Sequence, residues 1–354
     1  MLTNKRWNLC RAIALLLGLL VLAACTGGRQ AGSLTTWPEA SPTSPLVTAT
    51  NLQAAPVIPT ATPVAPTAPV VATAILQPVE PSLLPPTEPP PPTEIPAIRM
   101  AVIGDYGWGS QPEADVAALV NSWNPDFVVT LGDNNYPDGA ADTIDQHIGQ
   151  FYQQYIHPYQ GQYGPGAEQA RFFPTMGNHD WNTDRGQPYL DYFDLPGNER
   201  YYDFTWGPLH IFAVSSDSRE PDGVSRKSIQ AQWLEEGLAA SSSPWKLVIM
   251  HHPPYSSGLH GPVDWMRWPF QEWGASAVLA GHDHTYERLL IDGMPYFING
   301  LGGGPIYYFN NPLPGSEERY NDDYGAMLVT ASSTQILFEF YNRSGELIDT
   351  YQLN

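Results

Sequence analysis

Short apolar runs and segments with helical periodicity alternate along residues 98–354. The apolar runs predict buried strands at 98–103, 127–131, 172–176, 209–214, 247–250 and 277–280. Apolar residues at helical spacing predict helices at 113–123, 143–159 and 229–240. From residue 286 onward, apolar and polar residues alternate as they do in strands and hairpins. This succession of strands and helices predicts an α/β domain.

Several of the expected strands are followed directly by a residue type that binds metal ions. These residues are Asp105, Asp133, Asn178, His251 and His282. Open α/β sheets gather their functional sites at the carboxyl ends of the strands, so we expect these side chains to lie close together. The sequence therefore predicts a metal site at this edge.

Residues 1–24 have the pattern of a secretory signal peptide. Lys5, Arg6 and Arg11 precede a short apolar run over residues 12–24. A membrane-spanning helix needs roughly 20 apolar residues, so a permanent span is the weaker interpretation. We expect this segment to direct export and then to be removed.

The end of this segment, Leu22-Ala23-Ala24-Cys25, resembles the lipobox of bacterial lipoproteins. The resemblance implies cleavage before Cys25 and lipidation of its sulfur. The alternative is an ordinary signal peptide that happens to contain a cysteine. Because more than one acyl chain gives stable anchoring, the expected mature protein is a membrane lipoprotein that faces the extracytoplasmic side.

Residues 25–97 have the composition of a linker. Of the 36 prolines in the chain, 17 lie between residues 31 and 97. Proline fixes φ and removes a backbone donor, so a helix or a sheet is excluded here and disorder is expected. The segment either spaces a catalytic domain, 98–354, from the membrane or is a disordered leader with no spacing role.

Charge and cysteine content restrict the chemistry of the site. The formal net charge is −20, which argues against nucleic-acid binding. The two cysteines, Cys10 and Cys25, lie in or directly after the signal segment. A disulfide framework and a cysteine-based zinc site are therefore excluded from the catalytic domain. Any metal there must be bound by His, Asp, Asn or Tyr.

Five short motifs occur in order along the catalytic domain. They are Gly104-Asp105-Tyr106-Gly107, Gly132-Asp133-Asn134-Asn135-Tyr136, Gly177-Asn178-His179-Asp180, Val248-Ile249-Met250-His251 and Gly281-His282-Asp283-His284. Through them the chain resembles the calcineurin-like metallophosphoesterases, and among these the purple acid phosphatases of the small tartrate-resistant type. The resemblance covers nearly all of residues 98–354. It implies a single domain with a four-layer α-β-β-α sandwich.

The resemblance also implies two metal ions with overlapping ligand sets. Asp105, Asp133, Tyr136 and His284 would hold the first ion, and Asp133, Asn178, His251 and His282 would hold the second. Two cations roughly 3.5–4 Å apart repel each other, so a bridging carboxylate is needed between them. Anionic and phenolate oxygens suit Fe(III), whereas neutral Asn and His ligands suit Fe(II), Zn or Mn.

Tyr136 distinguishes the subfamilies, because purple acid phosphatases carry a tyrosine at this position as an Fe(III) ligand. The alternative is a packing tyrosine near a turn. Asn178 and His179, together with His260 nine residues after His251, are implied to bind the substrate. His179 is the first candidate to protonate the leaving alkoxide and His260 the second.

The implied reaction is hydrolysis of a phosphate monoester by a metal-bound hydroxide, as in acid phosphatases, because metal binding lowers the pKa of water from ~15.7 to near 7. One alternative is a phosphodiesterase or nucleotidase with two divalent metals. A second is a surface lipoprotein that binds phosphate-bearing ligands without chemistry. The loops that set specificity, such as 181–200, 217–227 and 304–325, indicate no particular ester.

The remaining histidines of the domain have less specific interpretations. His147 and His157 lie in an expected helix and His210 in an expected strand, so packing or surface roles are favoured. His252, which follows a ligand position, and Arg288, which follows the last histidine motif, could support the site through hydrogen bonds.

Overall fold

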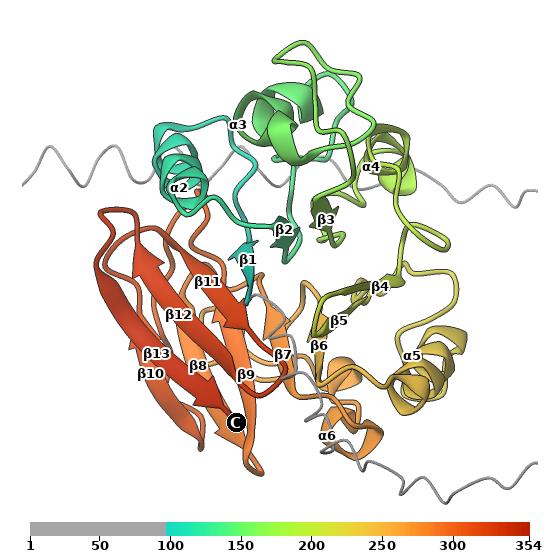
Figure 1. The fold of residues 1–354 in the computed structure, drawn as a ribbon, viewed down its shortest axis with the longest axis vertical. Coiled ribbons are helices and arrows are strands. Elements are labelled where there is room, and N and C mark those ends of the chain that lie inside the picture. The colour runs from blue at the N-terminus through green and yellow to red at the C-terminus, as the bar shows by residue number, and fades with distance from the viewer. Residues whose placement is uncertain (1–96) are drawn as a thin grey trace, which may run out of the picture. The chain divides into compact units, whose positions relative to one another are not determined.

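The computed structural model describes residues 97–354 (Figure 1). The expected signal peptide, Cys25 and all of the expected linker except Ala97 lie outside the described residues. The described residues belong to one compact unit. None of its helices combines the length and the apolar character that a membrane span requires.

Two mixed β-sheets form the centre of this unit. The first has the order β13-β12-β11-β1-β2-β3 and the second has the order β10-β8-β9-β7-β6-β5-β4. The strands of the first sheet are β1 (Ile98–Ile103), β2 (Phe127–Thr130), β3 (Phe172–Pro174), β11 (Gly325–Ala331), β12 (Ile336–Asn342) and β13 (Leu347–Leu353). Those of the second are β4 (Tyr202–Trp206), β5 (Leu209–Ala213), β6 (Trp245–Ile249), β7 (Ala277–Ala280), β8 (Tyr286–Ile291), β9 (Met294–Asn299) and β10 (Ser316–Tyr320).

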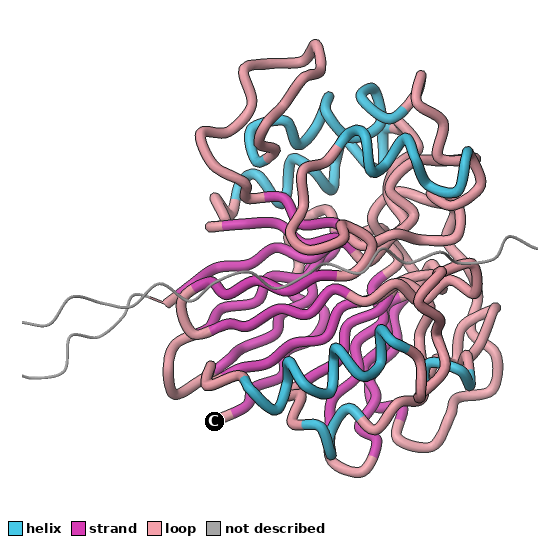
Figure 2. The backbone as a smooth tube through the Cα atoms, turned by 90° about the vertical axis from the view of Figure 1, so that its right-hand side faces the viewer, coloured by secondary structure: helices cyan, strands magenta, loops and turns pink. Residues whose placement is uncertain are grey.

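Helices lie on both sides of the paired sheets (Figure 2), as expected for a metallophosphoesterase sandwich. They are α2 (Gln111–Ser122), α3 (Gln150–Tyr152), α4 (Gln187–Tyr192), α5 (Ile229–Ala240) and α6 (Phe270–Trp273). Alternate residues of β6 pack in different clusters: Leu247 joins the cluster shared with the first sheet, and Val248 joins the one shared with α5 and α6. Because both faces of this strand are buried, its sequence is a continuous apolar run.

The expected helix over residues 143–159 was wrong in extent and in regularity. The segment contains a π-helical turn (Asp145–Gly149), the short α3 and a 3₁₀ turn (Gln153–Tyr155). Ile156 is extended, so His157 lies outside any helix. Pro158 accounts for the early end, because proline disfavours the helical conformation in the residue before it. The sequence patterns also missed α4, β4 and α6.

Side chains connect the two sheets directly. Asn299 on β9 donates from Nδ2 to the carbonyl of Val102 on β1 at 3.0 Å. Arg288 on β8 donates from Nε to Oδ2 of Asp349 on β13 at 2.7 Å, and the hydroxyl of Tyr286 donates to the same oxygen at 2.8 Å. Arg288 therefore joins the sheets, and its suggested role in supporting the site is not seen.

A buried carboxyl group fixes the loop between β1 and α2. Ser110 caps α2 by accepting from the backbone N–H of Glu113. Glu113 in turn accepts from the backbone N–H groups of Trp108 and Gly109, at 3.0 and 2.7 Å. This reciprocal arrangement resembles a capping box and sets the path of the loop. Burial raises the pKa of Glu113 well above its usual range, because its charged form loses hydration.

Glu113 should make the stability of the fold depend on pH. The pKa of Glu113 is higher in the folded state than in the unfolded chain. Its contribution to the free energy of unfolding is therefore fully present below the unfolded-state pKa and is lost as the pH rises through the folded-state pKa. Glu113→Gln removes this term, so the variant should gain stability relative to the wild type as the pH rises from about 4 to about 8. Urea unfolding at several pH values measures the difference.

The exposed Glu235 on α5 provides the matched control for this prediction. The difference in unfolding free energy between Glu235→Gln and the wild type should vary much less over the same pH range. A Glu113→Gln difference that stays constant with pH would contradict the assignment.

Candidate metal centre

The site lies where the carboxyl ends of two sets of parallel strands meet. In the first sheet β1, β2 and β3 run parallel, and in the second β5, β6 and β7 do. Asp105, Asp133 and Asn178 follow the first set, while His251 and His282 follow the second. The sequence predicted the role of the strand ends, but not that two different sheets supply them.

The backbone is strained at three of these residues. Asp105, Asp133 and His282 have φ values of 54°, 52° and 71°, in the left-handed region that residues with a side chain rarely adopt. Strain of this kind persists where the surrounding structure enforces it, commonly at functional sites. A glycine precedes each of the three, and a Cβ on Gly281 would lie 2.5 Å from Oδ2 of Asp105. Close packing therefore explains a glycine at this motif position.

The four residues of the first expected ligand set converge on the hydroxyl of Tyr136. This oxygen lies 2.9 Å from Oδ2 of Asp133, 3.3 Å from Oδ1 of Asp105 and 3.1 Å from Nε2 of His284. Nδ1 of His284 lies 2.6 Å from the carbonyl of Pro305, to which it donates, so Nε2 keeps its lone pair for the site. Donor atoms on one ion with bonds of about 2.0–2.2 Å lie about 3–3.5 Å apart, so the set has the spacing of a metal site.

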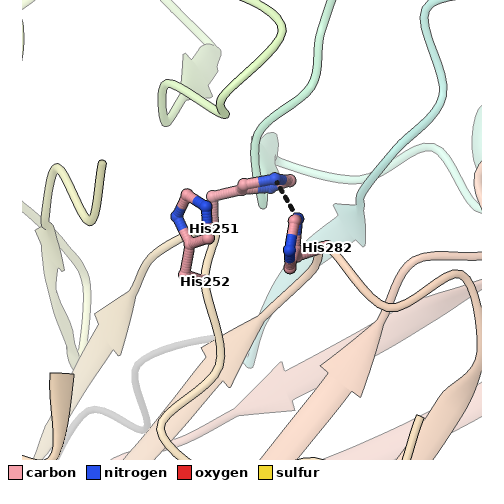
Figure 3. A group of neighbouring side chains, drawn as sticks. All are labelled: His251, His252 and His282. Carbon is pink, nitrogen blue, oxygen red and sulfur yellow. Dashed lines mark hydrogen bonds between the residues drawn. The ribbon is translucent and has the colours of Figure 1, made fainter. Parts of the chain in front are cut away.

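The second expected set converges on Nε2 of His251. This atom lies 3.0 Å from Oδ1 of Asn178, 3.1 Å from Nδ1 of His282 and 3.5 Å from Oδ2 of Asp133. Figure 3 shows the rings of His251 and His282 meeting at this contact. Nδ1 of His251 donates to the carbonyl of Leu131 at 2.8 Å, which again directs a lone pair into the cluster. Oδ2 of Asp133 faces both sets.

The donor chemistry of the cluster fits bound cations. Asp105 and Asp133 are almost completely buried beside each other and beside several nitrogen lone pairs. Burial alone would raise the pKa of Asp105, but without a cation the hydrogen bond and charge of a protonated His284 lower it below the usual range, so the group is an anion. A bound cation would take the place of that proton and leave the Nε2 lone pair as a ligand. Burial and the charges of Asp133 and Asp105 raise the pKa of Tyr136 well above its usual range. A cation reverses this effect and favours the phenolate.

His252 lies beside the second donor set, with a ring nitrogen within 4.8 Å of ring nitrogens of His251 and His282. Its Nδ1 lies 2.9 Å from Oγ of Ser216, and its ring centroid lies 4.5 Å from that of His282. Burial and the neighbouring His251 lower its pKa to about 3, so the ring is neutral. These contacts agree with the supporting role suggested by the sequence.

Both histidines expected to bind the substrate lie at the edge of the cluster. His179 donates from its backbone N–H to Oδ1 of Asp133 at 2.9 Å, and its Nδ1 contacts the carbonyl of Pro137. Its Nε2 lies 3.9 Å from Oδ2 of Asp133, and its side chain is 34% exposed. The exposed His260 stacks on His282 with ring centroids 4.4 Å apart. The two histidines thus border the cluster on its solvent side.

Two further aspartates of the motifs, Asp180 and Asp283, hold the backbone of the loops that carry site residues. Asp180 accepts from the backbone N–H groups of Asn134 and Gly177, at 3.1 and 2.8 Å. Asp283 accepts from the backbone N–H of His260 at 2.7 Å. Their role is to fix the backbone that carries Asp133, Asn178 and His260.

The other three histidines lie away from the ligand contacts. His147 pairs with Oδ1 of Asn135 at 2.9 Å, and His157 contacts the carbonyl of Ala167 at 2.9 Å. His210 lies between Asp203 and Ser241. Packing and surface roles, as the sequence indicated, describe them.

Three further residues border the cluster and were missed from the sequence. Arg219 donates from Nη2 to the carbonyl of Asn178 at 2.8 Å and is held by Asp217. Tyr307 stacks on His284 with centroids 4.1 Å apart and an interplanar angle of 6°. Trp108 stacks on Tyr136 at 4.6 Å and 17°. Trp108 adjoins the first motif, whereas the loops of the other two carry no motif that indicates a role.

Comparison with known proteins defines the family. Residues 98–286 match the calcineurin-like phosphoesterases. The chain belongs to this family. Membership implies a binuclear metal site and a phosphoester substrate. The convergent His and Asp side chains are the candidate ligands of the metal ions.

Similar sequences include acid phosphatases. The chain is 26% identical to human tartrate-resistant acid phosphatase type 5, covering 71% of this chain and 89% of that one. It is 25% identical to purple acid phosphatase 4 of Arabidopsis thaliana, covering 70% of this chain and 81% of the plant protein. The chain is thus related to purple and tartrate-resistant acid phosphatases, at a distance.

Similar folds occur in a plant phosphatase and in a parasite anchor protein. Yellow lupin purple acid phosphatase PPD1 aligns with a TM-score of 0.58 and 19% identity, over 72% of this chain and 53% of that chain. GAP50, the anchor in the inner membrane complex of Plasmodium, aligns with a TM-score of 0.56 and 18% identity, over 73% and 89%. At these identities the likeness concerns the fold.

Asp133 should be required for binding both metal ions, because its carboxylate faces both donor sets. Asp133→Asn keeps the shape and removes the charge that offsets the repulsion between two cations. Elemental analysis of the purified protein should show metal content falling from about two ions per chain to about one or fewer. The half-exposed Asp203 on β4 is the control, and Asp203→Asn should keep both ions. Retention of two ions by Asp133→Asn would exclude a shared ligand.

Proposed function

We propose that this protein is a binuclear-metal acid phosphatase that hydrolyses phosphate monoesters. The observation that carries this proposal is the contact of the Tyr136 hydroxyl with Asp105, Asp133 and His284, next to a second donor set that shares Asp133. A phenol in this position is what distinguishes the purple acid phosphatase type. The similarity to acid phosphatases over about 70% of the chain supports the same activity.

The two donor sets favour different metal ions. Two carboxylates and a phenol favour Fe(III) with Asp105, Asp133, Tyr136 and His284. Neutral Asn178, His251 and His282 beside the shared carboxylate favour Fe(II), Zn or Mn. When bound, the metal pair would supply positive charge for the phosphoryl oxygens and would lower the pKa of water toward neutrality.

Residues of this chain then orient the ester and supply the proton for its leaving group. Oδ1 of Asn178 points toward Nε2 of His251 in the second donor set. The amide N–H groups of Asn178 are therefore available to donate to a phosphoryl oxygen. His179 is oriented by Pro137, so its Nε2 is directed toward the cluster and is the first candidate to protonate the leaving alkoxide. His260 is fixed by Asp283 and His282. It donates a hydrogen bond to the phosphate or, as the second candidate, protonates the leaving alkoxide.

The proposal predicts activity and colour together. The full chain prepared with iron and with zinc or manganese should hydrolyse a chromogenic phosphomonoester and show a visible tyrosinate-to-iron absorption band. Tyr136→Phe should abolish the band, and Tyr351→Phe, on β13, should retain it. A visible spectrum with elemental analysis measures both variants.

Two results would contradict this proposal in different ways. An active, colourless protein with two divalent ions would indicate the phosphodiesterase or nucleotidase alternative, and Tyr136→Phe would then change neither spectrum nor metal content. A protein that holds both ions and binds phosphate ligands without turnover would instead indicate a non-catalytic binding lipoprotein.

We further propose, from the sequence of residues 1–97, that the enzyme is exported and anchored by lipid at Cys25. Mass spectrometry of the mature protein should find Cys25 at the N-terminus with acyl chains attached. Cys25→Ala should lose the modification and leave the membrane fraction. An unmodified Cys25, or cleavage at another position, would contradict the anchor without affecting the enzymatic proposal.

A further inference from the structure

Two partly exposed tryptophans lie beside the metal centre. Trp108 is 40% exposed and Trp265 is 45% exposed, whereas most large apolar side chains of the described residues are buried. An exposed aromatic ring beside a site offers a π face on which a planar group can stack. The two indoles differ in what they contact.

Trp108 is the outer layer over a candidate metal ligand. Its ring lies nearly parallel to that of Tyr136, with centroids 4.6 Å apart, and Tyr136 is only 2% exposed. Because the stack covers one face of the indole, its exposed surface belongs to the other face and the edges. Trp265 lies farther from the ligands, with its ring 6.2 Å from that of His252. Its Nε1 donates to the carbonyl of Ser216 at 3.1 Å.

The backbone holds Trp108 in this place. The backbone nitrogen of Trp108 lies 2.8 Å from the carbonyl oxygen of Tyr106 and 3.0 Å from Oε2 of the buried Glu113, and it donates to both. Tyr136 donates from its backbone N–H to the carbonyl of Gly107 at 2.8 Å, which joins the two loops. The indole is therefore preorganised, and a ring that stacks on it would meet little loss of conformational entropy.

A second aromatic ring borders the same donor set. The ring of Tyr307 lies parallel to that of His284, with centroids 4.1 Å apart. Its centroid lies 5.4 Å from that of His260, a candidate substrate-binding residue, at an interplanar angle of 71°. Aromatic rings therefore flank Tyr136 and His284, the two ring-bearing ligands of the first set. A planar group attached to a phosphate at this centre would find the π surfaces of Trp108 and Tyr307 nearby.

We propose that Trp108 is a stacking platform for a planar aromatic ring in the leaving group of the ester. This inference rests on the proposed phosphatase function and specifies its substrate class: phosphate monoesters that carry an aromatic ring close to the ester oxygen. The indole adjoins Tyr136, whose hydroxyl lies in the donor set, so only a ring within a few bonds of the phosphorus can reach it. Recognition is by ring planarity, not by hydrogen bonds to a particular base or sugar.

Benzyl phosphate and cyclohexylmethyl phosphate isolate this property. Both release a primary alkoxide, and their rings have similar size, so the ratio of their kcat/KM values reports planarity rather than leaving-group chemistry. The full-length wild type should prefer benzyl phosphate. Trp108→Leu should lower that ratio about two- to tenfold, the range expected for loss of one aromatic stack, and Trp108→Phe should retain most of it.

Trp265→Leu is the matched control, since Trp265 is similarly exposed but does not contact Tyr136. Its ratio should equal that of the wild type. Calorimetric binding of benzylphosphonate and cyclohexylmethylphosphonate gives the same comparison without turnover. If Trp108→Leu does not fold, as judged by circular dichroism, Trp108→Met carries the same expectation.

The outcomes separate this inference from the enzymatic proposal. Hydrolysis of both esters with a ratio unchanged by Trp108→Leu overturns the platform and leaves the phosphatase proposal standing. A ratio controlled by Trp265 overturns it as well. Absence of hydrolysis, with benzylphosphonate binding that still depends on Trp108, overturns the phosphatase proposal and supports the platform. Absence of both hydrolysis and selective binding overturns the two together.

Discussion

The carboxylate of Asp133 is the interaction on which the site depends. Its Oδ2 faces the Tyr136 hydroxyl at 2.9 Å and Nε2 of His251 at 3.5 Å, so one group belongs to both donor sets. Oδ1 accepts from the backbone N–H of His179 at 2.9 Å, which fixes the orientation of the carboxylate. Two neighbouring cations repel each other unless negative charge lies between them, and Asp133 would supply that charge where the two donor sets meet.

Much of the surrounding structure serves to hold Asp133 there. Its φ of 52° directs it off the end of β2, and a Cβ on Gly177 would collide with its backbone nitrogen at 2.2 Å. Because His251 comes from the second sheet, the distance between the sheets sets the distance between the donors. Asn299 on β9 donates a hydrogen bond to the carbonyl of Val102 on β1, and this contact helps to fix the position of one sheet relative to the other near the site. The unfavourable backbone geometry is thus compensated by packing across both sheets.

The sequence predicted the parts of this arrangement that depend on local pattern. The bounds of β1, α5 and β7 agree with their apolar runs and periodicity, because burial of these segments leaves a clear signature. The ligand residues were visible because they lie in five short motifs at or just after the ends of strands. The observed geometry brings all seven expected ligand residues together.

Other features depend on contacts that sequence spacing does not reveal. The segment around residues 145–155 has helical periodicity, but Pro158 limits it and its turns are irregular. Arg288 follows the last histidine motif, yet its partner is Asp349, at the far end of the chain. Trp108, Arg219 and Tyr307 acquire their places beside the site only through the meeting of separate loops.

Anomalous diffraction from crystals of the metal-loaded protein tests the central claim most directly. The account predicts two peaks about 3.5–4 Å apart with the carboxylate of Asp133 between them. One peak should contact Tyr136 and His284, and the other should contact His251 and His282. A single peak, or two peaks that do not share Asp133, would contradict the account.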